Sequence, residues 1–164
     1  MNDDPAQPRP SRPDQSVAEV RKELVLAALP TAVNVVGLFV RATFADMPAD
    51  TAHVQRVETV AKYLAGHAVA TTGVRSAAPL YRAEFDDLHA IVARLRITRK
   101  HTVVEMWDRS VERPSKQLGR SNTVLHPDTW SYAFPDPGIR VVWCAVAADS
   151  SPRPAHRTSN PPDP

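Results

Sequence analysis

The sequence predicts an α+β two-layer sandwich, in which helices cover one face of a largely antiparallel, mixed sheet. Three observations lead to this prediction: one long segment with a clean helical period, a second helical segment just before it, and paired strand-like segments in the second half. Runs of helices beside runs of strands are typical of folds that bury one core between a helical layer and a sheet.

The longest periodic segment runs from residue 50 to residue 73 and predicts a helix. Its apolar residues recur at steps of three and four, namely Val54, Val57, Ala61, Leu64 and Ala68. Asp50 or Thr51 can cap its start, and Gly73 can adopt the left-handed backbone that ends many helices. Thr59, Tyr63 and His67 lie one turn apart at the edge of the stripe, so they share a face. We expect a chemical site, if there is one, to border that face.

The other elements follow from shorter patterns. The apolar run 23–29, closed by Pro30, predicts a strand, and the spacing over 32–45 predicts a helix. Alternation predicts two hairpins, one from strands 91–97 and 102–108, the other from strands 130–134 and 139–147. The segments 72–87 and 109–129 have no period, and we interpret them as connections, the second of which is where a lid would lie.

Composition indicates one domain with proline-rich ends. The chain has 164 residues, of which 43% are hydrophobic, which suits one sizeable core. Nine of the sixteen prolines lie in the first 13 or the last 13 residues. We therefore predict disordered tails over 1–16 and 149–164 and a folded domain over 17–148.

Charge and apolar runs exclude several classes of protein. A formal net charge of +2 is too small for nucleic-acid binding by charge alone. The longest apolar run, 33–40, is far shorter than the roughly 20 residues that span a bilayer. Residues 1–16 do not resemble a secretory signal, and the single cysteine, Cys144, fits a reducing compartment. We expect a cytoplasmic protein without direct contact with nucleic acid or membrane.

Short catalytic and metal-binding motifs are absent from the sequence. It has no Gly-x-Ser-x-Gly elbow, no phosphate-binding glycine loop and no pair of histidines at metal-ligand spacing, so we predict no metal site. Cys144 is interpreted as a small buried side chain. Four basic residues gather on the first hairpin and could hold phosphates or an acidic partner, but we favour a solvated strand face: Arg94, Arg96, Arg99 and Lys100.

Asp108 is the strongest single candidate for a ligand contact. It ends a mostly apolar strand and precedes a long connection, so its carboxylate is expected at the mouth of the sheet. Tyr63 and His67 lie on the helix that must pack on that sheet. The sequence therefore predicts that these three residues lie near one another.

These residues resemble the GHKL (histidine kinase-like) ATPases, and among them small bacterial proteins related to anti-sigma-factor serine kinases. The resemblance spans residues 23–146. It depends on the strand and turn 23–31, the helix 38–44, the segment YLAGHAVATTG at 63–73, the strand VVEMWDR at 103–109 and the strand RVVWCAV at 140–146.

The resemblance implies a nucleotide site whose catalytic part has been lost. Tyr63 stands where the family has a catalytic glutamate, and a tyrosine with an ordinary pKa near 10 is a poor general base at neutral pH. His67 stands where the family has an asparagine that binds magnesium, a metal that prefers oxygen ligands. Asp108 matches the aspartate that reads adenine. Gly119 and Arg120 are what remains of the glycine-rich lid, and Arg120 or Lys116 could meet a phosphate.

The resemblance therefore implies a regulatory protein that binds another protein, with ATP a candidate ligand, magnesium disfavoured and no catalytic residue retained. The implied partners are a sigma factor, a small anti-anti-sigma protein or a transcription regulator. One alternative is an active ATP-dependent serine/threonine kinase in which Glu84 or Asp87 replaces the missing base. Another is a non-catalytic dimerisation module, for example one that forms a homodimer. Tyr63 and neighbouring side chains would then fill its nucleotide pocket.

Overall fold

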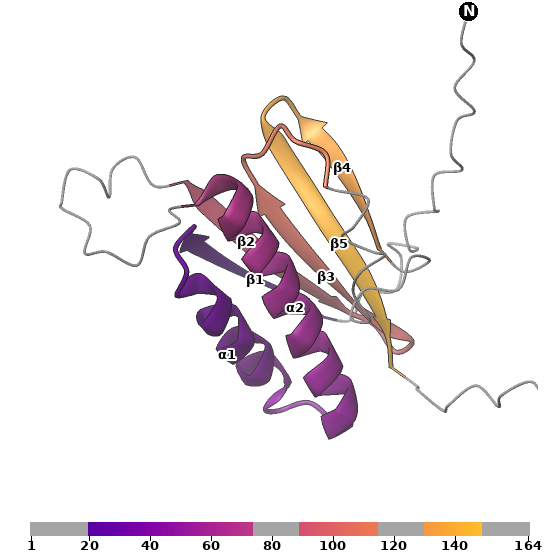
Figure 1. Ribbon diagram of the computed structural model, residues 1–164. Helices are drawn as coiled ribbons and strands as arrows, with labels where there is room; N and C mark the ends of the chain where they lie inside the picture. The colour runs from indigo at the N-terminus through magenta and orange to yellow at the C-terminus, as the bar shows by residue number, and fades with distance from the viewer. Residues whose placement is uncertain (1–19, 74–88, 115–129, 149–164) are drawn as a thin grey trace, which may run out of the picture.

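The structure, a computed structural model, describes residues 20–73, 89–114 and 130–148, which form one layer of helices on one sheet (Figure 1). In chain order the elements are β1 (Val20–Ala27), α1 (Ala32–Phe44), α2 (Thr51–Thr72), β2 (Ala90–Ile97), β3 (His101–Asp108), β4 (Trp130–Asp136) and β5 (Ile139–Ala147). The strand order is β1-β2-β3-β5-β4, and all four neighbouring pairs are antiparallel. The predicted α+β two-layer sandwich is confirmed, with a sheet that is antiparallel throughout the described residues.

The core lies between the two helices and the facing side of the sheet. Val57, Ala61, Leu64 and Ala68 of the predicted α2 stripe are buried, and Val54 is half-buried at its edge. They meet side chains from the three central strands that point the same way: Ile91, Ala93, Leu95, Val104, Met106, Val142 and Cys144. The expected buried position of Cys144 is confirmed. Neither described helix is long and apolar enough to cross a membrane.

The first strand is longer at its start than predicted, because charged residues there interrupt the apolar pattern. β1 begins at Val20, three residues before the expected start, and ends at Ala27. Arg21 and Lys22 interrupt the apolar pattern, yet both have backbone partners on β2, where Val20 lies opposite Ile97 and Ala27 opposite Ala90. β1 is an edge strand, so charged side chains are accommodated there.

The basic face of the first hairpin was predicted to be solvated, which holds for the exposed Arg99 and Lys100 and is wrong for Arg94 and Arg96. Glu105 on β3 is only 2% exposed and lies between two arginines of β2. Arg96 Nε lies 2.8 Å from Glu105 Oε1, and Arg94 Nη1 lies 3.5 Å from Glu105 Oε2. Arg94 also donates to Glu23 and stacks over the Trp107 ring. These arginines neutralise acids within the sheet.

Gly73 ends α2 for a different reason from the one predicted. Its φ is −95° and its ψ 178°, which is extended and not left-handed backbone. A Cβ added at Gly73 would lie 2.2 Å from the carbonyl oxygen of Ala28 and 2.6 Å from that of Val69. Glycine is required there because the end of α2 passes close to the segment that leaves β1.

We predict that Gly73→Ala lowers the free energy of unfolding by about 1–3 kcal/mol, because the new methyl group must displace backbone. Gly66→Ala is the matched control in the same helix, since a Cβ there meets nothing within 4 Å. It should raise stability by about 0.5–1 kcal/mol through helix propensity. Urea unfolding of both variants measures the two effects, and equal stabilities would contradict the close approach at Gly73.

Candidate functional site

The candidate site is built around the carboxylate of Asp108 at the end of β3. Asp108 lies opposite Arg140 in the register between β3 and β5. Arg140 donates from Nε to Asp108 Oδ1 at 3.1 Å and from Nη2 to Asp108 Oδ2 at 2.5 Å. The side chains are 0% and 1% exposed, so this is a fully buried, two-pronged ion pair.

Three other groups complete the hydrogen bonds of this pair. Arg140 Nη1 donates to the carbonyl oxygen of Glu112 at 2.9 Å, and Nη2 donates to Thr71 Oγ1 at 2.9 Å. The backbone N–H of Ser110 donates to Asp108 Oδ1 at 2.9 Å. We call these five residues the Asp108 cluster. It joins the last turn of α2, the ends of two strands and the segment after β3, and its two charges neutralise each other.

His67 lies on α2, one turn before Thr71, at the border of the cluster. The imidazole is half-buried, and its Nε2 is a buried atom with no hydrogen-bond partner among the described residues. Burial and the nearby Arg140 guanidinium lower the pKa of His67, while the Asp108 carboxylate opposes them. The imidazole is therefore neutral at physiological pH, and His67 and Asp108 lie close enough to interact electrostatically.

Two other predicted residues, Tyr63 and Thr59, lie on the same helix as His67. Tyr63 is partly buried and packs against the core, one turn before His67. Thr59 is exposed, and its hydroxyl donates to the carbonyl oxygen of Gln55, so it serves the helix itself. Gly119, Arg120, Lys116, Glu84 and Asp87 lie outside the described residues.

Arg140 is the residue that the sequence reasoning missed. The alternation that turns Val142, Cys144 and Val146 toward the core also turns Arg140 toward it. A cation at a core-facing position needs a buried anion, and Asp108 is the carboxylate that ends the neighbouring strand. That alternation was a signal in the sequence for the pair.

This geometry leaves the Asp108 carboxylate already occupied. Both of its oxygens accept from Arg140, and one also accepts from Ser110. An adenine amine, which the family resemblance assigns to Asp108, would meet a carboxylate that is 1% exposed and has three of its roughly four acceptor sites taken. The described residues contain no group of three or more His, Cys, Asp or Glu side chains that could hold a metal ion.

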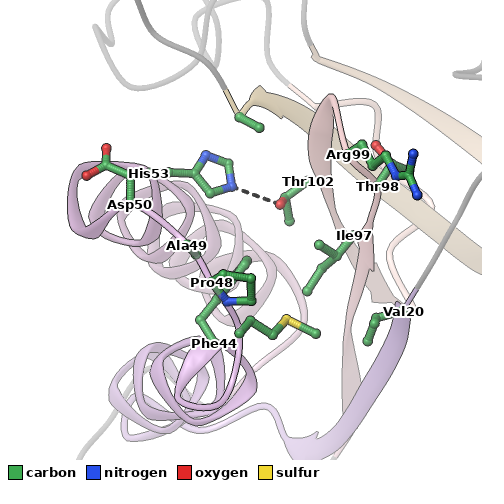
Figure 2. Close-up of a pocket in the computed structure, with 12 residues that line it drawn as sticks. Val20, Phe44, Pro48, Ala49, Asp50, His53, Ile97, Thr98, Arg99 and Thr102 are labelled. Atoms are coloured by element: carbon green, nitrogen blue, oxygen red, sulfur yellow. Dashed lines mark hydrogen bonds between the residues drawn. The ribbon is translucent and has the colours of Figure 1, made fainter.

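A cavity of about 510 Å³ lies at the opposite end of α2, between the α1–α2 connection and the β2–β3 hairpin (Figure 2). His53 reaches from the first turn of α2 toward Thr102 on β3, as Figure 2 shows. The His53 Nδ1–H donates to the carbonyl oxygen of Ala147 at 3.0 Å, so Nε2 accepts from the Thr102 hydroxyl at 3.0 Å. Phe44 contacts the ring edge to face. This neutral histidine anchors the start of α2 to the sheet.

Comparison with known proteins adds information at the level of the fold. No family model matches the chain, and no curated protein matches it. Among solved structures it is similar to the RsbU and RsbW domains of Rv1364c from Mycobacterium tuberculosis, with a TM-score of 0.53 and 12% identity. The match covers 79% of this chain and 33% of that chain, so this chain spans about a third of that structure. The likeness is one of fold, the two-layer arrangement of helices on an antiparallel sheet.

We predict that Asp108→Ala lowers the free energy of unfolding by about 3–5 kcal/mol, because it leaves the Arg140 guanidinium buried without an anion. Asp46→Ala removes an exposed carboxylate and should change stability by less than about 0.5 kcal/mol. Chemical unfolding without any nucleotide measures both. An Asp108→Ala variant as stable as Asp46→Ala would show that the pair contributes little.

We predict that stability falls as the pH is lowered from 7.5 to 5.5. Burial lowers the pKa of both His53 and His67 from 6.5, so the folded state favours the neutral rings. The resulting stability is present in full above the unfolded pKa and is lost as the pH falls below it toward the folded pKa values. Urea midpoints across this range measure the effect.

The variants for this pH test are His53→Gln with His67→Gln, and His89→Gln at an exposed position as the control. The double variant should flatten the pH dependence, while His89→Gln should keep it. A wild-type midpoint that does not change over this range would contradict the two shifts.

Proposed function

We propose that this chain is a regulatory protein of the histidine kinase-like ATPase fold that acts by binding another protein, with ATP binding and turnover weak or lost. The observation that carries the proposal is the Asp108–Arg140 pair. Arg140 of the same chain neutralises the carboxylate that would bind adenine and donates hydrogen bonds to both of its oxygens.

The energetics of displacement support this proposal. A nucleobase amine is a neutral donor, and a hydrogen bond of that kind contributes about 0.5–1.5 kcal/mol, against about 1.5–3 kcal/mol for one involving charge. The pair is fully buried, and an approach that separated the cation from its anion would cost about 3–5 kcal/mol. The described residues do not fit an adenine nucleotide at this position.

Tyr63 and His67 on α2 also support the proposed loss of ATP turnover. Tyr63 packs against the core, and His67 carries a neutral ring beside a guanidinium. Neither offers the carboxylate that would activate a hydroxyl or the oxygen ligands that magnesium prefers. No step of phosphoryl transfer can be assigned to the described residues.

The partner class follows from the sequence resemblance and from the fold. We propose a sigma factor, an anti-anti-sigma protein or a transcription regulator, encountered in the cytoplasm. The similarity of the fold to the RsbU and RsbW domains of Rv1364c supports this choice. ATP titration distinguishes this proposal from an active kinase, and sedimentation distinguishes it from a homodimeric module.

We predict that isothermal titration of the full chain with ATP shows no binding up to millimolar nucleotide, with or without magnesium, because Arg140 holds the carboxylate. Thermal unfolding under the same conditions should show no shift, since only a ligand that binds the folded state raises its stability. Magnesium-dependent binding of ATP, or phosphate transfer to one of the candidate partners, would establish the active kinase instead.

A further inference from the structure

The outward side of α1 carries a second apolar stripe, of which only Phe39 packs against the core. Val36, Val40 and Phe44 form the buried stripe, while four other residues recur at i, i+3, i+4 and i+7 on another side: Val35, Leu38, Phe39 and Ala42. We call these four the α1 outer stripe. Leu38 is 64% exposed and Val35 38%, Ala42 is exposed, and Phe39 is half-buried. This spacing matches the apolar contacts made between two packed helices.

Apart from Phe39, the residues of this stripe are exposed on the described structure. α1 has α2 on one side and no described element on the other (Figure 1). On the α2 side, Gly37 lies against Lys62, and Arg41 donates to Glu58. β1 beneath α1 is the edge of the sheet, because it pairs only with β2. The stripe therefore forms an accessible apolar flank of the helical layer.

Basic side chains border the stripe on both sides. Arg41 and Lys62 each lie 2.7 Å from the same Glu58 carboxylate. The two cations share one buried anion, so the group keeps a net positive charge. Arg41 remains 64% exposed, which leaves positive charge at the surface beside Leu38. On the β1 side, Lys22 is exposed and shares the helix-covered face of the sheet with its partner Leu95.

The nearby acids do not cancel this charge. Glu23 lies on the opposite face of β1, where its carboxylate accepts from Arg94. Asp46 lies in the connection beyond the end of α1. The flank thus combines an apolar centre with a basic rim.

We infer that the α1 outer stripe docks an amphipathic helix of a partner protein whose apolar residues are flanked by glutamate or aspartate. Acidic flanks would lie against Lys22 and Arg41, and complementary charge favours encounter and selects the partner. A second copy of the chain fits less well, because it would bring the same basic rim against itself. The inference depends on the proposed function, since it names the surface and the chemistry of the partner that the function requires.

The test is a selection of helical peptides on the full chain. The probe is a displayed library of amphipathic 18-residue peptides with fixed leucines on one face and positions beside them randomised between glutamate and lysine. We predict enrichment of glutamate at those positions. Leu38→Asp should weaken binding of an enriched peptide at least tenfold by placing a charge in the apolar contact.

Lys22→Glu tests the rim, and it should weaken the same peptide several-fold while improving binding of its lysine counterpart. Val111→Asp is the matched control, since it adds the same charge at another exposed apolar residue. It should leave affinity unchanged, with circular dichroism confirming that every variant folds. Leu38→Ser is a milder second variant for the central contact.

Other outcomes overturn the inference. These are no enrichment, enrichment of lysine, or binding that Leu38→Asp leaves intact. Self-association in sedimentation that Leu38→Asp abolishes would assign the stripe to a second copy. The peptide selection and the ATP titration are independent measurements, so failure of this inference is distinguishable from failure of the proposed function.

Discussion

The buried ion pair between Asp108 and Arg140 is the interaction on which the rest of the site depends. It holds the end of β3 against the start of β5, and through Thr71 it fixes the last turn of α2 on the same end of the sheet. A buried charge is tolerated only when it is paired and its remaining hydrogen bonds are satisfied. The carbonyl of Glu112 and the N–H of Ser110 meet that requirement.

The two ends of α2 are held by different chemistry. At its start, the neutral ring of His53 spans from the carbonyl of Ala147 to the hydroxyl of Thr102. At its end, the hydroxyl of Thr71 accepts from a buried cation. Between them the helix contributes an apolar stripe to the core. A helix fixed at both ends and along one side forms a rigid support for the elements beside it.

The proposed function depends on which polar groups have their hydrogen-bond partners within the chain. In the Asp108 cluster the chain supplies both the carboxylate and the group that occupies it, which favours a closed structural centre over a ligand site. On α1, Val35 and Leu38 face outward beside Arg41, whose side chain stays 64% exposed although it pairs with Glu58. Among the described residues, the Asp108 cluster is satisfied from within the chain, and the α1 flank is the surface that we propose for a partner.

The sequence by itself determined the elements whose pattern is local, namely the α2 stripe and the two hairpins. It did not reveal the full length of β1, because Arg21 and Lys22 obscure an edge strand that only its pairing with β2 defines. It also gave the wrong reason for Gly73, which is set by the distant carbonyl of Ala28. Only the tertiary structure decided the state of Asp108, because Arg140 lies 32 residues away along the chain and reaches it through strand register.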